Sequence, residues 1–160
     1  MHPSEADRLA SVLTERGVTM CCAESCTGGM IGATMTEAPG SSAYFLGSAV
    51  TYSNEAKMRI LGVSEGTLVA HGAVSDETAR EMAIGAVRAF GADCSVAVTG
   101  IAGPGGATDT KPVGLVYIAV SDGSRTVASR NLFQGDRGQV RGSTVREACG
   151  MLADFVEGRL

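Results

Sequence analysis

Ser25 occupies a position in the chain where a hydroxyl group could act as a nucleophile. It follows the short apolar run VTMCCA (18–23) and precedes Gly28 and Gly29, where a helix is expected to begin. Backbone N–H groups at a helix start lack partners, so they can bind an oxyanion or a phosphate. Ser25 is therefore a candidate nucleophile, and the oxyanion would lie near the backbone of Cys26, Thr27, Gly28 and Gly29. The alternative is that Ser25 only caps the helix.

A serine nucleophile needs a base, and the sequence offers few. Of the two histidines, His2 lies at the terminus and His71 falls in an expected loop ahead of a helix at 75–90. Nothing around His71 resembles a catalytic triad. The chain has thirteen basic residues, but only Lys57 and Lys111 are lysines. Arginine stays protonated at any ordinary pH. Lys57 is therefore the candidate base.

Lys57 closes the segment VTYSNEAK, which runs from an expected strand into an expected helix. If Ser53 caps that helix, the helix dipole lowers the pKa of Lys57 by roughly 0.3–1 kcal/mol, less than one pKa unit. A pKa near 8 needs about 3 kcal/mol, so burial must supply most of the effect. The alternative is an ordinary surface lysine. Tyr52, at the end of the strand, could relay a proton between serine and amine or could simply pack on the core.

Further residues could bind a ligand. Thr99 ends another expected strand, and the glycines that follow it, stiffened by Pro104, could approach an anion with their backbone. Two arginines one turn apart at the start of the last helix could hold a phosphate. Plain turns and a solvated helix end are the alternatives. The candidates for ligand binding are Thr99, Gly100, Gly103, Arg137 and Arg141.

The elements that would position these residues alternate between helix and strand. Apolar runs predict strands at 18–23, 47–52, 94–99, 114–120 and 125–133. Amphipathic patterns and caps predict helices at 4–16, 30–36, 53–61, 75–90 and 136–156. Ser53 or Asn54 is expected to cap the third helix, and Ser75 the fourth. This order predicts one α/β domain over 1–160, an α/β sandwich around a mixed, mostly parallel sheet of about five strands. Ligands bind beyond the carboxyl ends of parallel strands, where Ser25, Lys57 and Thr99 fall.

Composition limits the possible partners. The 13 basic and 17 acidic residues give a net charge of −4 without a basic cluster, so we expect no nucleic acid partner. No signal peptide or membrane-length apolar run is found, and we expect a cytoplasmic protein with no membrane contact. The spacing of the five cysteines suits free thiols and matches no zinc site, so neither a metal nor a cofactor is expected.

A set of motifs, in order along nearly the whole chain, resembles the CinA C-terminal domain family. The motifs are AESCTGG (23–29), VTYSNEAK (50–57), LGV (61–63), HGAVS (71–75), MAIGA (82–86), VTGIAGPGG (98–106), KPVGLVYIA (111–119) and GDR…VR (135–141). This family contains stand-alone nicotinamide-nucleotide amidases and the C-terminal halves of competence/damage-inducible CinA proteins. The larger CinA proteins carry an N-terminal domain that this sequence does not contain.

The resemblance implies a three-layer α/β/α sandwich with a mixed sheet. It also implies hydrolysis of nicotinamide mononucleotide to nicotinate mononucleotide and ammonia, without a metal. It implies a serine–lysine site in which the family's serine, tyrosine, lysine and threonine fall on Ser25, Tyr52, Lys57 and Thr99. The family's arginine is matched by either Arg137 or Arg141. We expect a homo-oligomer. The competing hypothesis is a non-catalytic nucleotide-binding or protein-interaction module, which would need neither a titratable Lys57 nor a free Ser25 hydroxyl.

Overall fold

A five-stranded mixed sheet forms the centre of the computed structural model, which describes residues 4–160; His2 lies outside them. The strand order is β2-β1-β3-β4-β5. β1 pairs in parallel with β2 and β3, whereas β4 is antiparallel to both β3 and β5. The predicted mixed α/β fold is therefore confirmed. The strands are β1 (Met20–Glu24), β2 (Phe45–Val50), β3 (Cys94–Gly100), β4 (Leu115–Ser121) and β5 (Thr126–Leu132).

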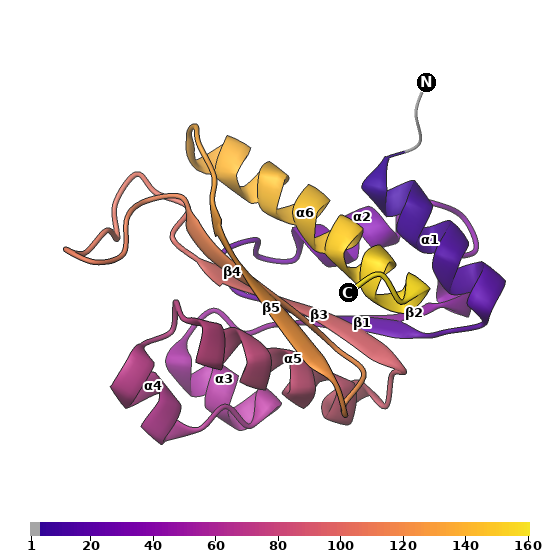
Figure 1. Cartoon of the computed structure of the whole chain (residues 1–160), viewed down its shortest axis with the longest axis horizontal. Helices are drawn as coiled ribbons and strands as arrows, with labels where there is room; N and C mark the ends of the chain where they lie inside the picture. Colours follow the sequence, from indigo (N-terminus) through magenta and orange to yellow (C-terminus); the bar gives the residue numbers. More distant parts are fainter. Residues whose placement is uncertain (1–3) are drawn as a thin grey trace.

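Helices cover both faces of the sheet and make three layers (Figure 1). One face carries α1 (Glu5–Arg16), α2 (Met30–Met35) and α6 (Arg137–Glu157). The other carries α3 (Asn54–Leu61), α4 (Glu65–His71) and α5 (Asp76–Phe90). A short 3-10 turn, Ser41–Ala43, precedes β2.

The three central strands, β1, β3 and β4, are buried on both faces, and this explains their largely apolar runs, whereas the edge strands β2 and β5 are only partly buried. Along β1, Met20 and Cys22 pack into the cluster beneath α1 and α6, while Cys21 and Ala23 pack towards α5. Side chains facing α5 are mostly small, and α5 meets them with small residues of its own, so this helix lies close to the sheet. The small residues of α5 are Ala79, Ala83, Gly85 and Ala86.

Helix ends follow the local sequence closely. The side chains of Ser53 and Ser75 accept hydrogen bonds from Ala56 N–H and Thr78 N–H, so both predicted caps are confirmed. Ser4 and Asp136 form complete capping boxes at α1 and α6. One prediction was wrong: His71, expected in a loop, is the last residue of α4. No residue of α4 is fully buried and only Leu68 packs against the core, so the helix has no continuous apolar stripe that would have identified it.

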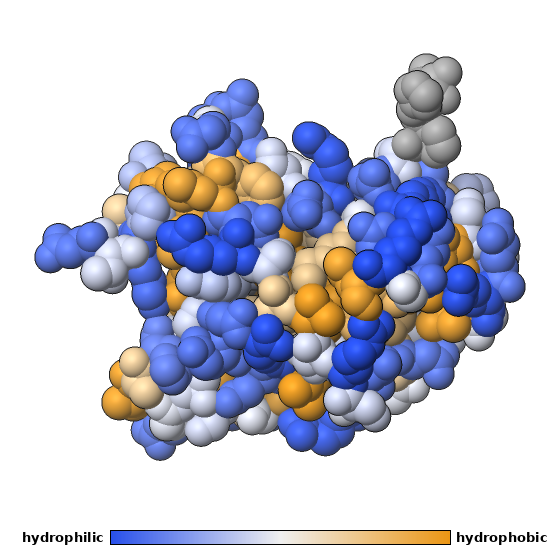
Figure 2. Space-filling model, viewed as in Figure 1, coloured by the Kyte–Doolittle hydropathy of each residue, from blue (hydrophilic) through white to orange (hydrophobic). Residues whose placement is uncertain are grey.

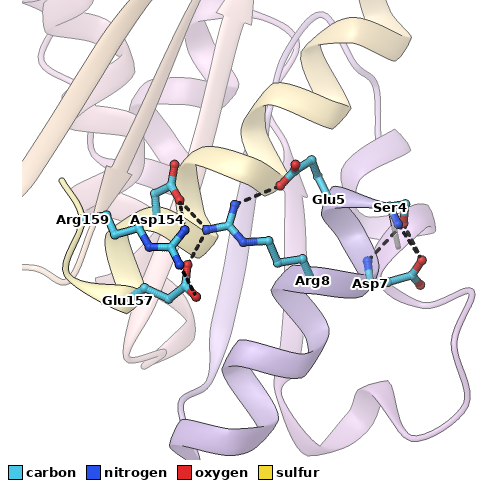
Figure 3. Close-up of polar contacts among 7 residues, drawn as sticks. All are labelled: Ser4, Glu5, Asp7, Arg8, Asp154, Glu157 and Arg159. Atoms are coloured by element: carbon cyan, nitrogen blue, oxygen red, sulfur yellow. Dashed lines mark hydrogen bonds and ion pairs between the residues drawn. The ribbon is translucent and has the colours of Figure 1, made fainter. Parts of the chain in front are cut away.

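The first and last helices are fastened by charged side chains (Figure 3). Arg8 on α1 contacts Glu5 at 3.1 Å and also reaches Asp154 and Glu157 on α6. Figure 2, drawn from the same side as Figure 1, shows that polar residues cover most of this face of the molecule, with a group of apolar residues beside the C-terminal end of α6. Arg8 lies among three carboxylates, so it links two helices that are distant in sequence.

Within residues 4–160, no helix has both the length and the hydropathy needed to span a membrane.

Candidate active site

The centre of the site is a direct contact between Ser25 and Lys57, which the fold brings together from positions 32 residues apart. Lys57 Nζ lies 3.1 Å from Ser25 Oγ, within hydrogen-bonding distance. Ser25 follows the last residue of β1, and Lys57 sits in the first turns of α3, just after β2. Because β1 and β2 are parallel neighbours, their carboxyl ends deliver both side chains to one point.

Lys57 is buried almost completely, with 1% of its surface exposed. Burial disfavours the charged amine and lowers its pKa from 10.5 to about 8, although the nearby Cys26 thiol opposes the shift. Burial is therefore the main cause of the lowered pKa, as the sequence argument required. A substantial fraction of a lysine with this pKa is neutral at mildly alkaline pH.

The remaining contacts of Lys57 orient its amine. Nζ donates to the carbonyl oxygens of Thr51, at 2.8 Å, and Tyr52, at 3.2 Å. Carbonyl oxygens can only accept, so they engage the two N–H bonds of a neutral amine. The nitrogen lone pair is then left for the third neighbour, the hydroxyl of Ser25. This geometry suits transfer of the Ser25 proton to Lys57.

Close packing fixes the helix that carries Lys57. Gly62 ends α3 in the left-handed conformation, with a φ of 70°. The last turn of α3 then rests on α5 at Gly85, where a β-carbon would lie 1.9 Å from the carbonyl oxygen of Leu61. Only glycine allows that approach. Arg88 also donates to the Leu61 carbonyl at 2.9 Å. The position of Lys57 thus depends on contacts made about one helical turn further along α3.

Predicted ligand residues line a hollow of about 180 Å³. Neither Ser25 nor Lys57 lines it, but Cys26 follows Ser25 in the chain and the Tyr52 carbonyl contacts Lys57. The glycine loop after β3 forms one wall, and Cys26, Tyr52 and Arg137 contribute the rest. The lining residues of the loop are Gly100, Ile101, Ala102, Gly103, Gly105 and Gly106. A larger hollow of about 500 Å³ lies among α1, β5 and α6, and none of the predicted site residues lines it. The smaller hollow is the better candidate for a ligand site because its lining residues Cys26 and Tyr52 neighbour Ser25 and Lys57.

Tyr52 lies differently from the expected relay. Its side chain is 62% exposed, and its hydroxyl accepts a hydrogen bond from Arg137 at 3.3 Å. Among residues 4–160, no hydrogen bond joins that hydroxyl to Ser25 or Lys57. Tyr52 instead contributes its backbone carbonyl to Lys57. The phenol lines the hollow, where it can meet a ligand, and a relay role would require it to leave Arg137.

The two arginines have distinct surroundings. Arg137 donates to the Gly103 carbonyl at 2.8 Å and lines the hollow. Arg141 lies instead against the turn after Ser25, where it donates to the carbonyls of Cys26, at 3.1 Å, and Thr27, at 3.0 Å. Arg137 is therefore the better placed to bind a ligand anion, and Arg141 holds the backbone of the turn.

Thr99 is fully buried, and its hydroxyl donates to the carbonyl of Ala73 at 2.7 Å. Its O–H is thus committed, and only its oxygen lone pairs remain for a ligand. Contact between Thr99 and a ligand stays a prediction. Gly100, which follows it, does line the hollow.

The N–H groups expected to receive an oxyanion are partly occupied. Gly28 N–H donates to the Ser25 carbonyl at 3.1 Å, and Gly29 N–H donates to the Glu24 carboxylate at 3.0 Å. Within residues 4–160, the N–H groups of Cys26 and Thr27 have no hydrogen-bond partner. Of the four residues predicted for this role, only Cys26 and Thr27 retain a free donor. Glu24 itself was missed by the sequence argument, although a carboxylate ending a buried apolar run could have signalled it.

The cysteines are buried free thiols. Burial raises the pKa of Cys26, the one nearest Ser25, to about 11, so its thiol is protonated at neutral pH and a poor nucleophile. In the described part of the chain, no three His, Cys, Asp or Glu side chains are grouped in a way that could hold a metal ion.

Fold and site together define an α/β/α sandwich with a serine hydroxyl held against a buried lysine amine at the strand ends. The family model described as the CinA C-terminal domain matches residues 3–156, and the chain belongs to this family. The resemblance seen in the sequence motifs is thereby confirmed.

Known relatives support the same assignment. A CinA-like protein of Citrifermentans bemidjiense is 53% identical over 150 residues, covering 94% of this chain and 36% of the relative. The chain thus spans about a third of the length of the curated relatives it matches. Among solved structures, a CinA superfamily protein from Klebsiella pneumoniae has a TM-score of 0.93 and 35% identity, covering 96% of each chain. The competence/damage-inducible protein CihA of Agrobacterium tumefaciens has a TM-score of 0.89 and 42% identity, covering 95% of this chain and 96% of that one.

Proposed function

We propose that this protein is a nicotinamide mononucleotide amidohydrolase, which releases nicotinate mononucleotide and ammonia by serine–lysine acyl transfer. The observation that carries the proposal is the 3.1 Å contact between Ser25 Oγ and a lysine amine whose pKa is lowered to about 8. A non-catalytic binding module has no use for a buried amine held against a serine hydroxyl, because burying that amine costs stability.

The first half of the reaction forms an acyl-enzyme. Ser25 Oγ attacks the carboxamide carbon while its proton passes to Lys57 Nζ. The carbonyl oxygen becomes an oxyanion, which the free N–H groups of Cys26 and Thr27 stabilise. As the tetrahedral intermediate collapses, the carbon–nitrogen bond breaks and the Lys57 ammonium returns its proton to the leaving amide nitrogen. Ammonia departs and the nicotinoyl ester of Ser25 remains.

The second half restores the enzyme. Lys57, now neutral, takes a proton from a water molecule as that water attacks the ester carbon. Collapse breaks the bond to Ser25 Oγ, which takes the proton back from Lys57, and the carboxylic acid product loses its own proton to solvent. The phosphate of the substrate lies towards the glycine loop and Arg137, whose guanidinium can pair with it. Tyr52, at the edge of the hollow, is placed to contact the nucleotide.

The test is incubation of the purified protein with nicotinamide mononucleotide and measurement of ammonia and nicotinate mononucleotide. We expect equal amounts of the two products, and none from Ser25→Ala prepared in parallel, which controls for contaminating amidases. Binding of the nucleotide by calorimetry without any ammonia release would instead support the binding-module hypothesis.

A further inference from the structure

Glu24, the last residue of β1, is a fully buried carboxylate with no part in the mechanism above. Its two oxygens accept five hydrogen bonds. Oε2 accepts from Thr27 Oγ1 at 2.6 Å, Gly29 N–H at 3.0 Å and Ile31 N–H at 3.0 Å, while Oε1 accepts from Gly32 N–H at 2.9 Å and Ser48 Oγ at 2.8 Å. Each backbone partner can only donate, so the set suits an ionised carboxylate and compensates its burial.

Four of these five donors come from residues 27–32, the segment that directly follows the nucleophile. Glu24 and Ser25 are adjacent, so one carboxylate ties the start of this turn to its end and to the first turn of α2. The turn also needs left-handed backbone at Gly28, with a φ of 59°, and at Gly29, with a φ of 102°. Glu24 therefore determines the path of the chain on the carboxyl side of Ser25.

The hydrogen bonds within the turn determine which donors remain available. Glu24 takes the N–H of Gly29, and the Ser25 carbonyl takes the N–H of Gly28. The N–H groups of Cys26 and Thr27 are left without a partner among residues 4–160. Without the carboxylate, the N–H groups at the start of α2 would seek other acceptors, and the turn would have no fixed shape.

We propose that Glu24 is a positioning residue, which holds the turn so that the N–H groups of Cys26 and Thr27 stay available beside Ser25 Oγ. This role rests on the proposed acyl-transfer function. Glu24 acts through hydrogen bonds to the turn rather than through its charge on the base. None of the five hydrogen bonds of Glu24 reaches Lys57.

Two substitutions that each remove one hydroxyl distinguish a positioning role of Glu24 from a role in which the hydroxyl donors only stabilise its buried charge. Thr27→Val keeps the shape of the side chain but removes the turn's hydroxyl donor to Oε2. Ser48→Ala removes a hydroxyl donor to the same carboxylate from β2, away from the turn. Each variant leaves Glu24 with four donors, so a role confined to stabilising the buried carboxylate predicts similar effects from both.

The positioning role predicts different effects. Loss of one oxyanion donor costs about 10²–10³ in kcat, so a loosened donor turn should cost roughly tenfold. We expect Thr27→Val to lower kcat about tenfold with little change in KM or in the pH midpoint. Thr27→Ser, which keeps the hydroxyl donor, should have a kcat close to that of the unmodified protein. Ser48→Ala should stay within about twofold of the unmodified protein. Glu24→Gln should lose more, with its melting temperature measured alongside to exclude unfolding.

A second readout keeps this test independent of the substrate assignment. The rate at which a fluorophosphonate probe labels Ser25, followed by mass spectrometry, reports the reactivity of the hydroxyl and of its oxyanion donors. Labelling without ammonia release would refute the proposed substrate, and the labelling rates of the Thr27 and Ser48 variants would still test Glu24. Equal rates for Thr27→Val and the unmodified protein, or equal losses in Thr27→Val and Ser48→Ala, would overturn the positioning role. A protein that neither hydrolyses the nucleotide nor takes the label would overturn both proposals.

Discussion

Replacing Lys57 tests the proton-transfer role most directly. The pKa of Lys57 falls from 10.5 to about 8. At pH 7 this raises the neutral fraction of the amine from roughly 1 in 3,000 to roughly 1 in 10. Lys57→Arg keeps a positive charge but cannot accept a proton, so turnover should fall by about 10²–10⁴ across the pH range. Lys57→Met, which also lacks a base, should lose activity to a similar extent.

The pH dependence of turnover shows which protonation state of Lys57 is active. The deprotonated amine is the active form, so turnover of the unmodified enzyme should rise with pH and level off above about pH 8. Ammonia release from nicotinamide mononucleotide, measured from pH 6 to 10 for the three proteins, gives the profile. A Lys57→Arg enzyme with near-normal turnover would refute the general-base role and would point to a purely electrostatic one.

Stability gives an independent check on the same pKa. The folded protein binds the Lys57 proton more weakly than the unfolded chain does, so the unfolded chain holds more protons between about pH 8 and pH 10.5. The free energy of unfolding should therefore gain a contribution from this group as pH rises through that window, up to about 3 kcal/mol. Denaturant titrations should show this contribution in the unmodified protein and not in Lys57→Met. The same slope in both proteins would mean that Lys57 is not the group responsible.

Four other substitutions and one control test the remaining parts of the site. Ser25→Ala should fold, bind nicotinamide mononucleotide and release no ammonia, and measurable turnover would exclude a covalent Ser25 intermediate. Arg137→Ala should mainly raise KM, because Arg137 lines the hollow. Arg141→Ala should mainly lower kcat, because Arg141 binds the carbonyls of the turn after Ser25. Steady-state kinetics with the opposite pattern would mean that the two arginines have exchanged roles. Gly85→Ala places a β-carbon 1.9 Å from the Leu61 carbonyl oxygen and should cost about 1–3 kcal/mol of stability and some turnover. Gly142→Ala, with no atom within 4 Å of the added carbon, is the matched control and should stabilise α6 slightly.

Much of the fold could be predicted because local signals agreed with the tertiary structure. Continuous apolar runs identified the buried strands, and serine caps with terminal glycines located the helix ends. The helix that ends at His71 was not predicted, since α4 is short, contains Gly66 and fully buries none of its residues. A helix with one core contact, at Leu68, shows no apolar periodicity that could be detected in the sequence.

The site was predictable to the extent that its chemistry depends on residue type. Lysine is rare in this chain and, unlike arginine, it can lose its proton, so Lys57 was identified as the candidate base. Contacts were not predictable, because they depend on where side chains point. Tyr52 turns outwards to Arg137, while Arg141 turns inwards to the backbone after Ser25. Both orientations follow from tertiary packing, which spacing along the sequence does not encode.

Two buried ionisable groups near Ser25 illustrate how the same environment serves different purposes. Glu24 receives five donors, so its charge is compensated and its position is fixed. Lys57 has only two carbonyl acceptors besides the Ser25 hydroxyl. Burial destabilises the charged ammonium more than these hydrogen bonds stabilise it, so the pKa of Lys57 is lowered. A fully compensated charge suits a residue that must hold a turn still. An incompletely compensated one suits a residue that must change its protonation state during each turnover.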